Sequence, residues 1–249
     1  MLKWDRTKGR PEPIRLLNTI TETENGEPLV DVRIVCPSVR IIRPQVIPYV
    51  RETVALMCEK ATQLLPEGYH LGLVEGWRPI ERQQRIYDFV WKSAEEAFPH
   101  RDKSALRRTV CRWVAPTDQK APPGHCTGAA VDVWLVDDHG QDIDVSSPFD
   151  RFKSAPTYSF GLSDEASRNR MILVEAMLEV GFSNCRDEWW HYSYGDAGWA
   201  VRMAQPDCCY GLVTLGPEFY EEEERLWLEA AKTRQSPFAS TSQPEEQES

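Results

Sequence analysis

GHCTGAAVDVWLVD, at residues 124–137, holds a strong strand signal. The preceding stretch, VAPTDQKAPPG at 114–124, is too rich in proline and glycine for regular structure. From Ala129 to Val136 the residues are almost all small, apolar or β-branched, which predicts a buried strand. Asp132 falls inside this strand, where an unsatisfied charge is costly. A metal ion or a hydrogen-bonded turn would each satisfy it, so His125 and Asp132 are candidate metal ligands, with a structural Asp132 as the alternative.

Working outward, helical and extended patterns alternate without a regular βαβ repeat. Helices are expected over Gln45–Leu65, from Pro79 to about Ala94, from an N-cap at Ser163 to Gly181, and over Pro217–Thr233; further strands are expected over Tyr69–Val74 and Glu188–Tyr194. This order predicts one α+β domain with a small, mainly antiparallel sheet flanked by helices. We expect that domain to cover residues 30–234, after an N-terminal arm (1–29) and before a disordered Ser-, Pro- and Glu-rich tail (235–249).

Charge and composition exclude several classes of protein. The formal net charge is -10, which argues against a nucleic-acid partner because phosphate binding needs a basic face. No apolar run is long enough to cross a membrane, and the N-terminal sequence MLKWDRTKGRPEP lacks a signal-peptide core. The seven cysteines include no CxxC pair. We therefore expect a cytoplasmic protein with reduced thiols and no membrane partner.

A second informative segment is EWWHYSY, residues 188–194. Glu188 and His191 are flanked by large aromatic residues, and a partly dry carboxylate has a raised pKa that suits a general base. A core strand with a satisfied histidine is the common alternative. Residues three apart on a strand face opposite sides, so Glu188 must precede the strand or lie at a bulge. Two histidines and a carboxylate make a catalytic zinc set, although the usual HExxH helix is absent.

A third segment, VEGWRP at residues 74–79, places Arg78 between a predicted strand and a predicted helix. A cation at that position could stabilise the oxyanion of a tetrahedral intermediate. A surface or salt-bridging arginine is the more common interpretation of such a residue when it is considered alone.

Taken in order, EGWRP, HCTGAAVDVWL, SPFDRF and EWWH resemble the D-alanyl-D-alanine dipeptidases, including the vancomycin-resistance type, over roughly residues 30–200. That family shares its fold with D,D-carboxypeptidases and the hedgehog domain. The resemblance implies one zinc ion per chain held by His125, Asp132 and His191. It also implies that Glu188 is the catalytic base and that Arg78 steadies the tetrahedral intermediate.

The resemblance further implies hydrolysis of a short peptide such as D-Ala-D-Ala in cell-wall precursor turnover. Asp150, in SPFDRF, corresponds to the acid that receives the substrate ammonium, and a turn-capping Asp150 is the alternative. Family members often have serine two residues before the first histidine, where this chain has Pro123, which leaves the exact dipeptide open. The alternative functions are a D,D-carboxypeptidase or cell-wall endopeptidase of the same fold, or a non-catalytic zinc-binding module.

Overall fold

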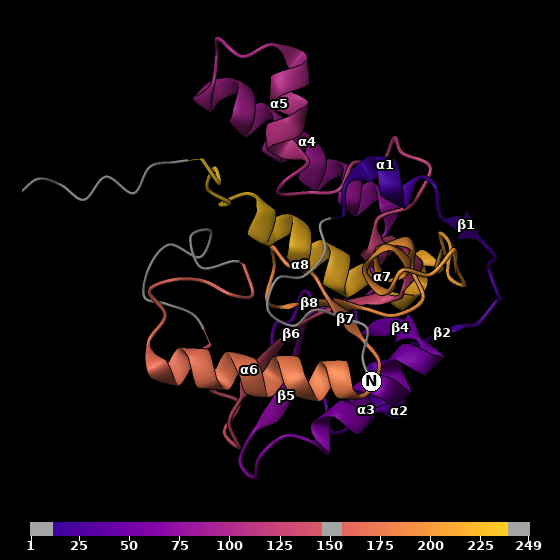
Figure 1. The fold of residues 1–249 in the computed structure, drawn as a ribbon, viewed down its shortest axis with the longest axis vertical. Coiled ribbons are helices and arrows are strands. Elements are labelled where there is room, and N and C mark those ends of the chain that lie inside the picture. The colour runs from indigo at the N-terminus through magenta and orange to yellow at the C-terminus, as the bar shows by residue number, and fades with distance from the viewer. Residues whose placement is uncertain (1–11, 146–155, 239–249) are drawn as a thin grey trace, which may run out of the picture.

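The computed structural model describes residues 12–145 and 156–238, and a five-stranded sheet lies at its centre (Figure 1). Its strand order is β3 (Arg40–Ile41), β5 (His70–Glu75), β6 (Ala130–Val136), β8 (His191–Ser193) and β7 (Ser183–Asn184). β3 pairs with β5 in parallel, and the other neighbouring strands are antiparallel. The predicted α+β class, with a small and mainly antiparallel sheet, is confirmed.

The core lies between this sheet and two helices, α3 (Glu52–Thr62) and α6 (Asp164–Glu179). Alternate residues of β6, namely Val131, Val133 and Leu135, are fully buried in this core. Asp132, which alternates with them, is therefore on the opposite face of the strand. Ser163 caps α6 as predicted, because its hydroxyl accepts a hydrogen bond from the amide of Ala166 at 3.0 Å.

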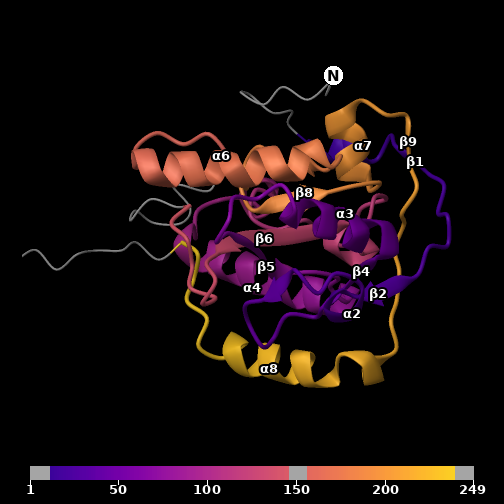
Figure 2. The ribbon, with the colours of Figure 1, turned by 90° about the horizontal axis from the view of Figure 1, so that it is seen from below.

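A helical hairpin extends away from the sheet (Figure 1). It consists of α4 (Ile80–Ala97) and α5 (Lys103–Val110), which bury a small apolar cluster of their own. The C-terminal helix α8 (Glu221–Ala231) lies on the other side of the strands from α6 (Figure 2). Within the described ranges, none of the helices combines the length and apolar character that a bilayer crossing requires.

Shorter elements complete the described chain. β1 (Thr21–Glu22) pairs in parallel with β9 (Asp207–Cys208), and β2 (Leu29–Asp31) pairs antiparallel with β4 (Tyr49–Arg51). The short helices are α1 (Ile14–Leu17), α2 (Val32–Val35) and α7 (Ala197–Met203), with 3-10 turns η1 (Gly124–Thr127) and η2 (Pro217–Phe219).

Three predicted elements had wrong boundaries. The helix expected over Gln45–Leu65 begins only at Glu52, because the preceding residues include Pro48 and pair with β2 as strand β4. The strand expected over Glu188–Tyr194 covers only its second half as β8. The helix expected over Pro217–Thr233 is divided at Tyr220 into η2 and α8.

Candidate metal centre

Strand register brings two of the predicted ligands together. Asp132 of β6 is paired directly with His191 of β8 and, on its other side, with Glu75 at the end of β5. Residues opposite each other in neighbouring strands present their side chains on the same face of the sheet. The Asp132 Oδ1 atom consequently lies 3.0 Å from Nδ1 of His191. Both side chains are mostly buried.

His125 reaches the same point from η1, the turn before β6. Its Nδ1 lies 2.9 Å from the carbonyl oxygen of Gly76, which only accepts, so Nδ1 carries the proton. The other ring nitrogen, Nε2, faces Asp132 and lies 3.2 Å from its Oδ1 atom. A carbonyl that fixes the tautomer in this way is the usual support of a metal-binding histidine.

Gly76 is required by this arrangement. A Cβ atom there would lie 2.8 Å from the carbonyl oxygen of Ile47 and 2.9 Å from that of Tyr49. In the opposite direction, the Arg78 amide donates to the carbonyl of His125 at 3.1 Å. The EGWRP and GHCTG segments are thus joined through their backbones, which sets the position of His125 relative to Arg78.

The donor set fits a divalent metal ion. The candidate ligand atoms of His125, Asp132 and His191 all lie within 4.8 Å of one another. Two ligands of a tetrahedral zinc ion, each about 2.1 Å from the metal, are about 3.4 Å apart, close to the spacing seen around Asp132. Burial opposes the charge on Asp132, but the two histidines outweigh it and hold the pKa of Asp132 well below its usual value. The carboxylate is therefore ionised, as metal binding requires.

Glu188 lies in the turn between β7 and β8, before the strand begins. Its carbonyl accepts a hydrogen bond from the His191 amide at 3.2 Å, as in a turn. Glu188 therefore precedes the strand, and the rule that strand residues three apart face opposite sides does not apply to Glu188 and His191. The side-chain amide of Asn184 donates to the carbonyls of Glu188, at 3.3 Å, and His191, at 3.1 Å, and so holds this turn. Burial raises the pKa of Glu188 to about 7. A carboxyl group with that pKa exchanges protons readily near neutral pH.

Arg78 is held in place by two neighbouring side chains. Its Nε donates to Glu75 Oε1 at 3.2 Å, and a terminal nitrogen donates to Gln83 Oε1 at 2.6 Å. Burial alone would lower the pKa of Arg78, but the negative charges of Glu75 and Asp132 raise it. Arg78 is thus a fixed, salt-bridged cation near Asp132. The predicted substrate-binding residue, Asp150, lies outside the described residues, so its role stays a prediction.

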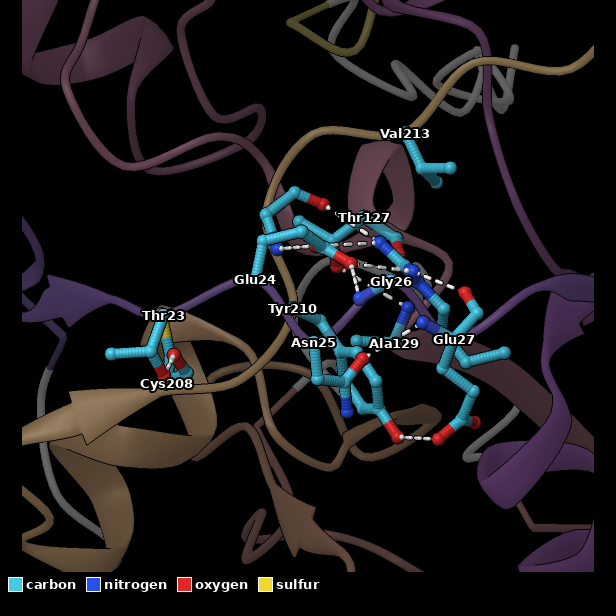
Figure 3. Close-up of polar contacts among 12 residues, drawn as sticks. Thr23, Glu24, Asn25, Gly26, Glu27, Thr127, Ala129, Cys208, Tyr210 and Val213 are labelled. Atoms are coloured by element: carbon cyan, nitrogen blue, oxygen red, sulfur yellow. Dashed lines mark hydrogen bonds and ion pairs between the residues drawn. The ribbon is translucent and has the colours of Figure 1, made fainter.

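Arg51 supports the turn that carries His125, and the sequence pattern did not reveal it. Its side chain is 1% exposed, and its Nε donates to the Thr127 carbonyl at 2.8 Å. Its terminal nitrogens contact both Glu24 oxygens at 2.9 Å, and Glu24 in turn accepts from the Gly211 amide at 2.6 Å. Figure 3 shows Glu24, Thr127 and Tyr210 gathered at this junction, where N- and C-terminal segments meet the η1 turn. Asn184, Glu75 and Gln83 were also missed: they bond to residues three to seven positions away, and no pattern of residue types marks them.

Comparison with known proteins adds an independent line of evidence. The family model described as D-ala-D-ala dipeptidase, Peptidase_M15, matches residues 46–210. Two curated proteins named D-alanyl-D-alanine dipeptidase are similar to this chain. The one from Synechocystis is 28% identical over 152 residues, covering 53% of this chain and 62% of its own length. The one from Escherichia coli is 31% identical over 87 residues, covering 34% of this chain and 45% of its own length.

The matches thus span less than two thirds of either relative. Among solved structures, a mutant of the vancomycin-resistance D,D-pentapeptidase VanY in complex with Zn(II) is similar with a TM-score of 0.40 and 15% identity. That match covers 76% of this chain and 96% of the other.

Proposed function

Because the chain belongs to the Peptidase_M15 family of D-Ala-D-Ala dipeptidases, as its motifs predicted, we propose that it is a zinc-dependent dipeptidase. Its substrate would be D-Ala-D-Ala or a related short peptide with D-amino acids, and its role the turnover or recycling of cell-wall precursors. The observation that carries the proposal is the convergence of His125, Asp132 and His191 near the partly buried carboxyl of Glu188. All four residues lie within the matched region.

His125, Asp132 and His191 would hold one zinc ion through Nε2, a carboxylate oxygen and Nδ1 respectively. When bound, zinc polarises the substrate carbonyl and activates water for attack at neutral pH. Glu188 accepts the proton of the attacking water and later delivers a proton to the leaving amine. Its raised pKa supports both transfers, since the group can gain and lose a proton at neutral pH.

Arg78 would donate hydrogen bonds to the oxygen on which negative charge develops. Glu75 and Gln83 hold two of its guanidinium nitrogens, which fixes the side chain before the reaction begins. A fixed donor of this kind stabilises the transition state without reorganisation.

Replacing Arg78 with alanine should mainly lower kcat. The expected cost is roughly 3–4 kcal/mol, or about 10²–10³ in rate, because an oxyanion contact strengthens only in the transition state. Steady-state kinetics with D-Ala-D-Ala would measure the change. Arg107→Ala is a suitable control, because Arg107 is a half-exposed arginine paired with Asp118. An unchanged kcat for Arg78→Ala would assign Arg78 a structural role only.

A dipeptidase is distinguished from a D,D-carboxypeptidase by recognition of a free amino terminus. We assign that recognition to Asp150, on the strength of the family motif. A site built around an ammonium rejects an analogue that lacks it by roughly 10⁴–10⁵-fold, because its polar groups are then left unpaired.

The chain should therefore cleave D-Ala-D-Ala, but not N-acetyl-D-Ala-D-Ala or longer stem peptides, and L-Ala-L-Ala should be poor. Asp150→Asn should weaken dipeptide hydrolysis and narrow the gap to the acetylated analogue. Mass detection of released alanine across this panel provides the measurement. Efficient release from the acetylated dipeptide or a pentapeptide would favour the carboxypeptidase.

The cytoplasm is the proposed location. All seven cysteines lie in the described ranges and are free thiols. Cys36, Cys58 and Cys126 are buried, and burial raises the pKa of each thiol above its ordinary value, which makes all three poorly reactive. Seven cysteines without a disulfide support a location in a reducing compartment.

A further inference from the structure

The C-terminal segment 211–231 lies beyond the residues that the family model matches. It contacts Trp77 and Arg82, which lie on either side of Arg78 in the sequence. Trp77, the residue before Arg78, donates through its indole nitrogen to the Val213 carbonyl at 3.1 Å. The Trp77 ring also meets the Tyr220 ring edge to face, with 5.2 Å between their centroids. Helix α8 follows directly and lies along one side of the strands (Figure 2).

A chain of alternating charges connects α8 with Arg78. Glu75 Oε1 lies 3.2 Å from Nε of Arg78 and 3.8 Å from a terminal nitrogen of Arg82. The Nε atom of Arg82 in turn lies 2.8 Å from Glu224, in the first turn of α8. Arg82 has no exposed surface, and Glu75 and Glu224 are each less than a fifth exposed. Two guanidinium groups therefore share Glu75. Glu224 is the second counter-charge of Arg82, and its other oxygen pairs with the half-exposed Arg85 at 2.5 Å.

Removing the charge of Glu224 would change how Glu75 is shared. A buried guanidinium without a counter-charge is strongly unfavourable, so Arg82 would draw on Glu75 instead. Its remaining terminal nitrogen already lacks a hydrogen-bond partner in the part of the chain that the structure describes. The Arg82 guanidinium lies 5.2 Å from the centre of the Trp227 ring of α8. This packing limits rotation of the Arg82 side chain toward solvent. Glu75 would then hold Arg78 less firmly.

We propose that Glu224 is a positioning residue for the reaction: through Arg82 and Glu75, it keeps the Arg78 guanidinium in place. This inference rests on the proposed function of the site. It makes α8, which the family model does not cover, part of the machinery that sets the rate.

The test is Glu224→Gln in the full chain loaded with zinc. We expect kcat for D-Ala-D-Ala to fall by about 10- to 100-fold, the loss that a small misplacement of a catalytic group produces, with KM and zinc content little changed. Glu75→Gln, which breaks the link on the other side of Arg82, should give a loss of the same kind. The matched control is Glu222→Gln, because Glu222 is exposed on the same helix and pairs with Arg225.

Positioning is separated from general stabilisation by repeating Glu224→Gln in an Arg78→Ala chain. If Glu224 acts through Arg78, the second substitution should cost little further activity there. A phosphinate analogue of D-Ala-D-Ala, which mimics the tetrahedral intermediate, should also bind more weakly to Glu224→Gln, as measured by calorimetry.

The inference is overturned by an unchanged kcat in Glu224→Gln, or by an equal loss with and without Arg78. Either result would leave the proposed function standing if the unsubstituted chain hydrolyses the dipeptide. Failure of the unsubstituted, zinc-loaded chain to do so would overturn both.

Discussion

His191→Ala should lose bound zinc and dipeptide hydrolysis together. The imidazole of His191 would supply one of the three ligand atoms, because its Nδ1 lies 3.0 Å from Asp132 Oδ1 in the candidate ligand set. Burial lowers the pKa of His191, but the hydrogen bond and charge of Asp132 outweigh it and raise that pKa. Without the imidazole, Asp132 keeps only His125 as a histidine partner. Only His125 and Asp132 would then remain to hold the metal.

The loss of activity should exceed the roughly 10²–10⁴-fold that a single general base contributes, because the electrophile and its activated water disappear with the metal. Elemental analysis after dialysis and an alanine-release assay would measure the two effects. His70→Ala is the matched control, since His70 begins β5 in the same sheet but pairs with Asp138. A His191→Ala chain that retains about one zinc and full activity would refute the ligand set.

Glu188→Gln should keep zinc but lower activity by roughly 10²–10⁴-fold. The substitution preserves the shape of the side chain and removes the group that carries the proton. The turn itself should persist, because its hydrogen bonds use the backbone of Glu188 and the side chain of Asn184.

Steady-state kinetics and metal content should be measured on the same preparation. Asp187→Asn is the control, because Asp187 lies next to Glu188 in the same turn but is 61% exposed and pairs with Arg186. If Glu188→Gln loses its zinc, Glu188 is a ligand rather than the base.

The local sequence pattern predicted those elements whose structure depends mainly on neighbouring residues, such as a β-branched strand or a capped helix. The strand predicted from Ala129 to Val136 differs from β6 by one residue at its start, and Ser163 caps α6 as predicted. The helix expected from Gln45 was wrong at its start, because pairing with β2 overrode an apolar spacing that suits either structure. Pairing of distant segments is not encoded in a local window.

The same distinction applies to the site. Residue types and order indicated His125, Asp132, Glu188 and His191, and strand register together with the η1 turn brings three of them within ligand distance. The supporting contacts were not foreseen. Glu75, Gln83 and Asn184 bond to residues three to seven positions away, but no pattern of residue types marks them. Glu224 contacts Arg82 from the last helix. Of these contacts, the one made by Glu224 depends entirely on tertiary packing.

The central claim is that this chain hydrolyses D-Ala-D-Ala with a single zinc ion held by His125, Asp132 and His191. Titration of the metal-free protein with Zn²⁺, followed by D-alanine release, tests it most directly. Activity should be absent without metal, should rise in proportion to added zinc, and should level off at about one ion per chain, as a three-ligand catalytic site requires. Full hydrolysis by the metal-free protein, or none at one equivalent of zinc, would contradict the claim.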